Sequence, residues 1–220
     1  MLKKIFKAAG YLLLLLITLS VVSYFSVTSY VNYKLEQRSE YRAYDSCHKI
    51  WSSRGLYDEW KDQNSIESVN RALSAGAGGV EIDLRYDIEL KKFIISHDYP
   101  YNLKNGKLLS LKELFDAVGD RGYYWLDYKN LRWLEPEQTR DAIARLKEIT
   151  ASGDLGERVY VEGSDPINLP LYRQAGFNTI FDIHPPQDSL PITEFVMNIY
   201  KVAYYFGGHT VIGMAYGSVD

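Results

Sequence analysis

Residues 78–98, GGVEIDLRYDIELKKFIISHD, contain two predicted strands and a group of acidic side chains. Apolar and charged residues alternate from position 80 to position 85, which is the period-two pattern of a strand with one apolar and one charged face. The carboxylates of Glu81 and Asp83 therefore leave the chain on the same face. Gly76, Gly78 and Gly79 precede this strand and end the helical pattern before it.

A second short strand is predicted over residues 93–96, and it leads directly into His97 and Asp98. We expect the two carboxylates and His97 to lie at neighbouring strand ends. Such an arrangement would hold a divalent cation beside a group that transfers protons, because carboxylate oxygens bind hard cations and histidine titrates near neutral pH.

Strands and helices alternate along the rest of the chain. Further strands are predicted over residues 44–50, 123–129, 159–163, 179–183 and within 202–215, with helices from a cap at Asn64 to Gly76 and over 110–119, 136–150, 169–176 and 192–200. A loop that contains Ser52, Ser53 and Gly55 is expected after the first strand. This order favours parallel βαβ units and predicts an α/β fold, a (β/α) barrel of the TIM type.

Two observations qualify the predicted barrel. A doubly wound open sheet is the alternative, but nothing in the sequence resembles its glycine-rich phosphate loop. The domain from position 44 to position 220 holds 177 residues, fewer than the roughly 250 typical of eight units. We therefore expect an incomplete barrel, or one truncated at its C-terminus.

The N-terminus predicts a membrane anchor. A basic tail, residues 1–7, precedes residues 8–31, which carry no charge and are long enough to cross a bilayer of roughly 30 Å as a helix. A cleaved signal peptide is the competing interpretation, but the apolar run is long and lacks a clear small-x-small cleavage site. Residues 32–43 resemble a polar stalk. The clustered lysines of the tail favour a cytoplasmic N-terminus and an extracytoplasmic domain, periplasmic or extracellular.

Composition excludes several classes of protein. The net charge is −3, with no basic excess of the kind that nucleic-acid binding requires. The only cysteine is Cys47, so neither an internal disulfide nor a cysteine-rich metal site is possible.

Five elements, spread over residues 46–129, resemble the glycerophosphodiester phosphodiesterase family, which belongs to the phosphatidylinositol phospholipase C-like barrels. The family's His-Arg-Gly at the end of the first strand looks like His48-Lys49, and its Glu-Asn-Thr is similar to Gln63-Asn64-Ser65. Its Glu-x-Asp matches Glu81-Ile82-Asp83, its His-Asp matches His97-Asp98, and its Glu-x-Lys looks like Asp127-Tyr128-Lys129. The spacing of Glu-x-Asp and His-Asp is the most specific of these features.

The resemblance implies a hydrolase that cleaves a phosphodiester with two histidines and one divalent cation. It assigns acid/base catalysis to His48 and His97, and the metal to Glu81, Asp83 and Asp127. Contacts to the substrate phosphate are assigned to Lys49 and Lys129, with Asn64 nearby. Oxygen ligands suit Mg²⁺ or Ca²⁺. A phosphodiester requires positive charge on its phosphoryl oxygens and a proton for its leaving group, which such a site supplies.

Three departures from the family pattern leave alternatives open. Lys49 replaces an arginine that would grip phosphate with two hydrogen bonds, and Gln63 replaces a glutamate. Asp127 is shorter than the usual glutamate and resembles the Asp-x-Lys element of sphingomyelinase D-type phospholipases. The resemblance therefore implies one of two substrate classes, glycerophosphodiesters or lysophospholipid and sphingolipid headgroups. The other hypothesis is a catalytically inactive, membrane-anchored binding module with the same fold.

Overall fold

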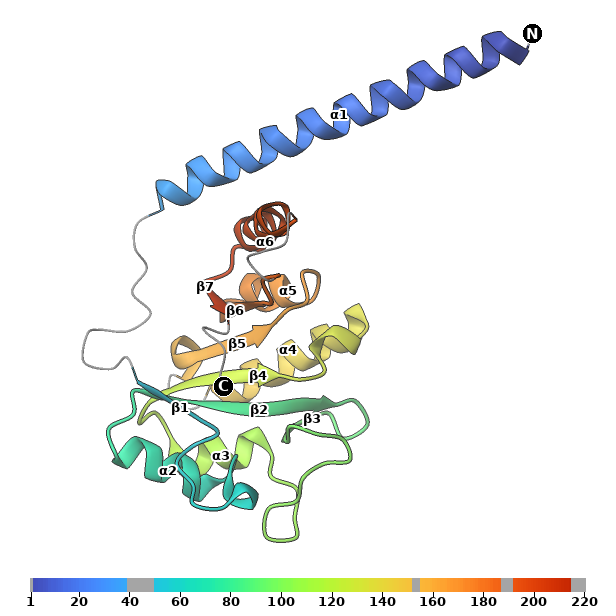
Figure 1. The fold of residues 1–220 in the computed structure, drawn as a ribbon. Coiled ribbons are helices and arrows are strands. Elements are labelled where there is room, and N and C mark those ends of the chain that lie inside the picture. Colours follow the sequence, from blue (N-terminus) through green and yellow to red (C-terminus); the bar gives the residue numbers. More distant parts are fainter. Residues whose placement is uncertain (1, 39–49, 152–154, 187–191, 215–220) are drawn as a thin grey trace. The chain divides into compact units, whose positions relative to one another are not determined.

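The computed structural model describes residues 2–38, 50–151, 155–186 and 192–214. It forms two compact units, one of residues 1–40 and 185–206 and the other of residues 41–184 and 207–220. The first unit contains helices α1 (Leu2–Glu36) and α6 (Thr193–Gly207). The second contains the sheet and every other described element, so the predicted site lies within this unit (Figure 1).

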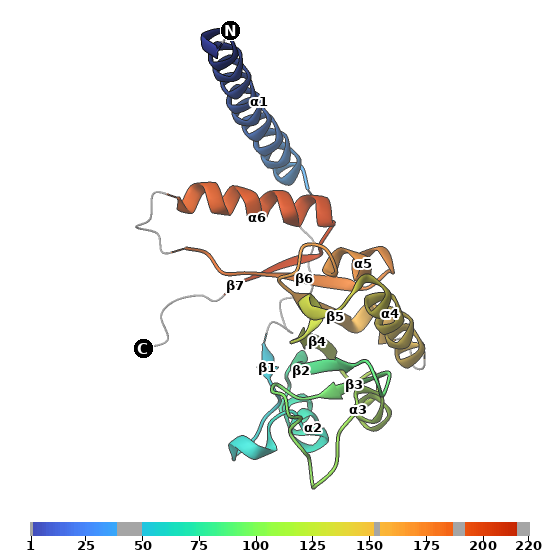
Figure 2. The same ribbon diagram turned by 90° about the vertical axis from the view of Figure 1, so that its right-hand side faces the viewer.

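A single sheet forms the second unit, and its strands follow the order β1-β2-β4-β5-β6-β7. These strands are β1 (Trp51–Ser53), β2 (Gly79–Asp87), β4 (Tyr123–Tyr128), β5 (Val159–Gly163), β6 (Asn178–Ile183) and β7 (Val211–Met214). All five pairings along this path are parallel, and the colours in Figure 2 follow the chain across the sheet. Within the described ranges no pairing joins β7 to β1. The sheet is thus a curled half-barrel, as the predicted incomplete barrel requires.

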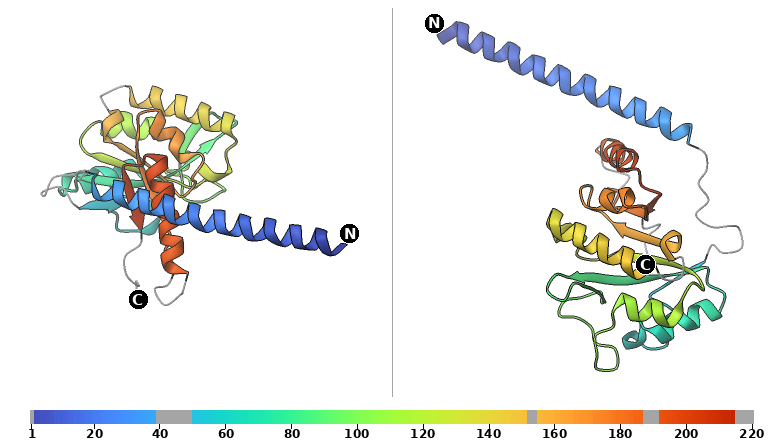
Figure 3. Two further views of the ribbon diagram at one scale, coloured as in Figure 1. Left: turned by 90° about the horizontal axis from the view of Figure 1, so that it is seen from above. Right: turned by 180° about the vertical axis from the view of Figure 1, so that it is seen from behind.

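Helices connect successive parallel strands and cover one face of the sheet (Figure 3). They are α2 (Ile66–Ser74), α3 (Leu111–Val118), α4 (Pro136–Thr150) and α5 (Leu169–Gln174), together with the short 3-10 turns η1 (Trp60–Asp62), η2 (Leu131–Trp133) and η3 (Leu155–Arg158). Helices α2 and α3 begin with capping boxes whose cap is a serine, Ser65 and Ser110. The cap of α2 is therefore Ser65 and not the predicted Asn64, which has a positive φ of 53° and serves the site instead.

The two faces of the strands differ in chemistry as the sequence predicts. On β2, Val80, Ile82 and Leu84 are fully buried against the helices, and Glu81 and Asp83 occupy the opposite, inner face. Beneath these carboxylates the inner face carries aromatic rings. The indole of Trp51 lies 5.9 Å from the ring of Tyr123 and 5.7 Å from that of Tyr160, measured between centroids. The half-barrel thus has an aromatic floor below an acidic upper layer.

Three predicted elements differ from the structure. The first strand is β1, so Ser52 and Ser53 lie in a strand and not in the expected loop. Strand β3 (Lys92–Ile95) pairs antiparallel with β2, because the chain turns back after Asp87 in a hairpin. Helix α6 extends to Gly207, beyond the predicted end at position 200, while β7 lies within the predicted range 202–215. Of the predicted first strand, only its last residue, Ile50, is described, and it is not in a strand.

Helix α1 is long and apolar enough to cross a membrane between Lys3 and Glu36, with a mean hydropathy of 2.2 over its most apolar part. It continues through Val31 to Glu36, so the first residues of the predicted stalk are helical. Within this unit α1 contacts α6: Tyr24 packs on Phe195 with 5.1 Å between ring centroids, and the guanidinium of Arg38 donates to the hydroxyl of Tyr204 at 2.8 Å.

Candidate functional site

Three carboxylates converge on the inner face of the half-barrel. Glu81, Asp83 and Asp127 each offer an oxygen within 4.8 Å of the others. Glu81 and Asp83 are two residues apart on β2 and so share a face, while the parallel register places Asp127 on β4 directly opposite Asp83. The structure therefore brings together the three carboxylates that the sequence singled out.

Asp83 is the buried centre of this cluster. Its side chain is fully inaccessible to solvent. Its carboxylate forms ion pairs with Arg54 Nε at 2.8 Å and with Lys129 Nζ at 2.7 Å. Asn64 Nδ2 donates to its carboxylate at 2.7 Å, and Asn64 Oδ1 accepts from its backbone N–H at 3.1 Å. Asn64 therefore fixes both the side chain and the backbone of Asp83. This role explains why Asn64 is buried just before helix α2.

Glu81 is held by residues at the C-terminal end of β1. The hydroxyl of Ser53 donates to Glu81 Oε2 at 2.6 Å, and the backbone N–H of Arg54 donates to the same oxygen at 3.1 Å. Burial raises the pKa of Glu81 to about 7, and the neighbouring charges of Asp83 and Asp127 add to this effect. The negative charge of the cluster is thus only partly compensated by the protein.

Lys129 bridges the other two carboxylates, because its Nζ contacts Asp127 as well as Asp83. Burial lowers the pKa of Lys129, but its bonds to Asp127 and Asp83 outweigh this and raise the pKa above the usual value. Burial also raises the pKa of Asp127, although Lys129 and the more distant His97 act against it. Lys129 is therefore charged and lies within the cluster, where a bound anion would meet it.

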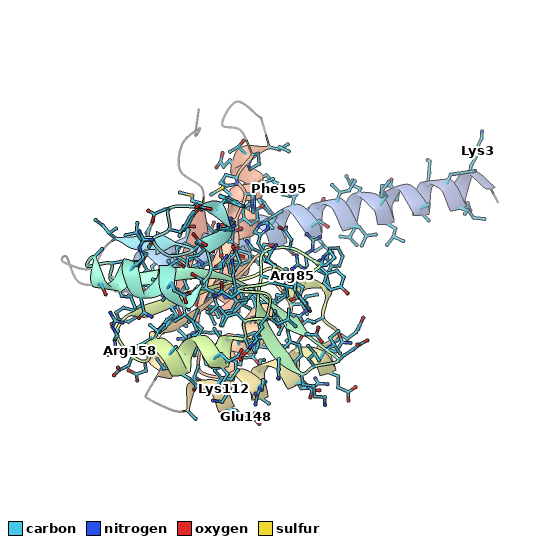
Figure 4. The ribbon with its side chains drawn as sticks, turned by 90° about the horizontal axis from the view of Figure 1, so that it is seen from below. Lys3, Arg85, Lys112, Glu148, Arg158 and Phe195 are labelled. Atoms are coloured by element: carbon cyan, nitrogen blue, oxygen red, sulfur yellow. The ribbon has the colours of Figure 1, made fainter. Side chains whose placement is uncertain are left out.

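His97 follows the hairpin of β2 and β3, which holds its backbone next to β2. The backbone N–H of Ser96 donates to the carbonyl of Asp83 at 3.1 Å, and Arg85 Nε, on the residue labelled in Figure 4, donates to the carbonyl of His97 at 3.1 Å. The imidazole is partly exposed, and its Nδ1 lies 2.7 Å from Asp98 Oδ1. This contact orients the ring and leaves Nε2 as the nitrogen able to exchange a proton with a ligand.

His48 and Lys49 lie outside the described residues. The basic side chain that follows β1 and meets the cluster is Arg54, which sequence reasoning missed, as it missed the contact of Ser53 with Glu81. The dipeptide Arg54-Gly55 was the available signal. Gly55 has a φ of +82°, and a Cβ there would lie 2.6 Å from the backbone of Ser68, so only glycine fits this turn.

Two further acids extend the negative region beyond the predicted set. Glu162 on β5 is paired in register with Asp127, and its Oε2 accepts from the indole N–H of Trp125 at 2.7 Å. Burial raises the pKa of Glu162 to about 8. With Asp182 on β6 it lines a cavity of about 220 Å³ that also contacts Asp127 and Lys129. The cavity therefore adjoins the carboxylate cluster.

The parallel strands, the connecting helices and the inner acidic layer define an incomplete (β/α) barrel. No family model and no curated protein matches the sequence. Among solved structures, the chain is similar to a glycerophosphodiester phosphodiesterase from Thermotoga maritima, with 20% identity, a TM-score of 0.55, and coverage of 78% of this chain and 75% of the other. It is also similar to one from Parabacteroides distasonis, with 17% identity, a TM-score of 0.54, and coverage of 77% and 84%. These similarities establish a shared fold.

Proposed function

We propose that the protein is a metal-dependent phosphoric diester hydrolase that acts on glycerophosphodiesters or on phospholipid headgroups. The observation that carries this proposal is the convergence of Glu81, Asp83 and Asp127 inside the half-barrel. The shared fold with glycerophosphodiester phosphodiesterases supports the same reaction class. A glycerophosphodiester is the preferred substrate class, and lysophospholipid or sphingolipid headgroups are the alternative.

The residues of the cluster fit one divalent cation. All three offer carboxylate oxygens, which Mg²⁺ and Ca²⁺ prefer. Within the described site only Arg54 and Lys129 are ion-paired with this cluster, while Glu162 and Asp182 add negative charge nearby. A cation would relieve the repulsion that remains. When bound, it would supply positive charge to the phosphoryl oxygens of the substrate.

The chain's own groups would perform the remaining chemistry. Lys129 is placed to contact a phosphoryl oxygen, because its ammonium already lies among the carboxylates. His97, oriented by Asp98, is placed to transfer a proton to or from the reacting oxygens, an effect worth roughly 10²-fold to 10⁴-fold. The assignment of His48 as its partner and of Lys49 as a second phosphate contact remains a prediction.

A second candidate function is favoured by one position. Ser53-Arg54-Gly55 lies at the end of the first strand, where the family has His-Arg-Gly. Serine cannot act as an imidazole base near neutral pH, and Ser53 donates its proton to Glu81. A binding module that holds a cation and a phosphate ester without turning it over would have this composition.

Hydrolysis assays with the full-length protein distinguish the two functions. The substrate is glycerophosphocholine or a lysophospholipid, with Mg²⁺ or Ca²⁺ added or removed by chelation. The hydrolase predicts cation-dependent release of the alcohol that His97→Ala lowers by roughly 10²-fold or more, with Asp116→Asn, on the exposed face of α3, as the control. Loss of activity in His48→Ala would support the two-histidine mechanism, and full activity in that variant would reject it.

Calorimetric titration completes the comparison. The binding module predicts heat of binding for Mg²⁺ or Ca²⁺ without release of alcohol. If a folded sample neither hydrolyses these substrates nor binds either cation, both functions are wrong.

We also propose that α1 is a retained anchor, with the N-terminus in the cytoplasm and the barrel outside it. The length and composition of α1 support the anchor, and the basic tail supports the orientation. Accessibility of an engineered cysteine in the barrel to a membrane-impermeant reagent tests the orientation, since a cytoplasmic barrel would remain unlabelled in intact cells.

A further inference from the structure

Within the first unit, helix α6 carries an apolar stripe that α1 leaves largely exposed. Phe195, Ile199 and Phe206 are 50%, 48% and 64% exposed, and Phe195 is labelled in Figure 4. With Val202 they follow the spacing i, i+4, i+7 and i+11, which places them on one side of a helix. No residue of α6 is buried. A helix with this pattern needs an apolar surface to cover its stripe.

Another side of α6 contacts α1, and these contacts are polar as well as aromatic. Asn198 Nδ2 donates to the hydroxyl of Tyr24 at 3.2 Å, and Lys201 Nζ donates to Asn32 Oδ1 at 3.3 Å. The rings of Tyr205 and Tyr30 meet edge to face at 5.9 Å. The two helices are thus joined within one unit, and Phe195, in the first turn of α6, adds a contact with Tyr24 at the edge of the stripe.

The position of the contact along α1 identifies what covers the stripe. The uncharged stretch of α1 ends at Val31, and α6 contacts α1 and the residues just after it, from Tyr24 to Arg38. At 1.5 Å per residue, this range extends about 10 Å to either side of the end of the uncharged stretch. A helix at that level lies where the acyl chains give way to lipid headgroups.

The composition of α6 fits this level. Tyrosine and phenylalanine are abundant in it, and Glu194 and Lys201 are its only charged residues. Tyrosine is enriched at membrane interfaces because its ring is apolar and its hydroxyl is polar. Lys201, together with Lys34 and Arg38 on the adjoining end of α1, places positive charge where lipid phosphates lie.

From these observations, and resting on the proposed membrane anchor, we infer that α6 is an interfacial helix whose stripe of Phe195, Ile199, Val202 and Phe206 inserts into the lipid bilayer. The occupant of the stripe is the acyl-chain boundary of the leaflet into which the C-terminal end of α1 opens. The helix that connects β6 to β7 would then link the barrel to the membrane surface at a second point.

Depth-dependent quenching in vesicles tests this inference with the full-length chain. Single cysteines at Ile199→Cys and Phe206→Cys, in a Cys47→Ser background, carry an environment-sensitive fluorophore. Leu15→Cys reports on the centre of α1, and Lys112→Cys, on an exposed face of α3, is the aqueous control. The protein is reconstituted into phosphatidylcholine vesicles in which part of the lipid is brominated on its acyl chains.

We expect brominated lipid to quench both α6 probes at least about twofold more than the Lys112 control, because interfacial helices bury their apolar face about 5–10 Å deep. If the Leu15 probe is quenched and either α6 probe behaves like the control, the inference is overturned while the anchor stands. If the Leu15 probe is not quenched, both are overturned. None of these outcomes depends on phosphodiesterase activity, so failure of the proposed catalytic function is measured separately.

Discussion

Replacing Asp83 by Asn should destabilise the metal-free protein by about 3 kcal/mol. The substitution keeps the shape of the side chain and removes the charge that pairs with Arg54 at 2.8 Å and Lys129 at 2.7 Å. Removing one partner of a buried ion pair costs about 3–5 kcal/mol, because the other charge is left uncompensated. Both partners are about one-fifth exposed, so the lower end of this range applies.

Repulsion within the cluster acts in the opposite direction but is weaker. The oxygens of Glu81 and Asp127 lie within 4.8 Å of Asp83, whereas the two cations lie within 2.8 Å of it. Since charge interactions fall with distance, losing the two closer attractions outweighs the relief of repulsion. The variant should therefore be less stable than the wild type although it removes one of three crowded carboxylates.

Urea unfolding in the presence of a chelator measures this difference. All four tryptophans, at positions 51, 60, 125 and 133, belong to the barrel unit, so their fluorescence reports its unfolding. Asp116→Asn removes an exposed carboxylate paired with Lys112 and should cost less than about 1 kcal/mol. The reasoning is refuted if Asp83→Asn is no less stable than this control.

The same variant tests the metal site. Mg²⁺ or Ca²⁺ at about 100 times its dissociation constant should stabilise the wild type by about 2.7 kcal/mol. Asp83→Asn lacks one of the three ligands and should gain far less at the same concentration. Equal stabilisation of both proteins would show that Asp83 does not bind the cation.

Three further predictions concern other residues of the barrel unit. Burial lowers the pKa of His209 to about 4, below its ordinary value of about 6.5. As the pH falls, the unfolded chain therefore binds the proton first, and the free energy of unfolding decreases by up to about 3 kcal/mol between about pH 6.5 and 4. Urea unfolding at both pH values should show a smaller decrease in His209→Gln. Gly79→Ala should cost about 1–3 kcal/mol, because its Cβ would lie 2.7 Å from the Trp51 ring, whereas Gly156→Ala meets no atom within 4 Å and should have little effect. Lys129→Met should raise the affinity for Mg²⁺ measured by calorimetry, because it removes an ammonium group that pairs with the proposed metal ligands Asp83 and Asp127. An unchanged or weaker affinity would contradict this prediction.

The regular part of the fold could be predicted from the sequence because successive residues of its strands alternate between a buried apolar face and a polar inner face. On β2 and β4, residues such as Ile82 and Leu126 are buried against helices while Glu81 and Asp127 occupy the inner face. That alternation predicts both the strands and the face that carries the acids. Their convergence follows from the parallel register, which places Asp83 beside Asp127 although 44 residues separate them.

The start of the barrel was not accessible in the same way. Strand β1 has only three residues, too few to show a period, and its position depends on pairing with Gly79–Glu81 on β2. The family element was assigned to His48-Lys49 because His48 is the histidine that precedes this region in the sequence. In the structure, the tight turn at Gly55 places Arg54 beside Asp83. The hairpin of β2 and β3 was missed because the sequence pattern of a strand does not show whether it pairs parallel or antiparallel with its neighbour.

The aromatic floor of the half-barrel gives the protein a built-in optical reporter. Trp51 and Trp125 have ring centroids 6.3 Å apart, and the indole N–H of Trp125 donates to Glu162, the acid paired with Asp127 on the adjacent strand. Any ion or phosphate ester that redistributes charge among these acids will alter the electric field at that indole. Ligand entry should therefore change the native emission spectrum, and the occupancy of the site can be followed without a label or a turnover assay.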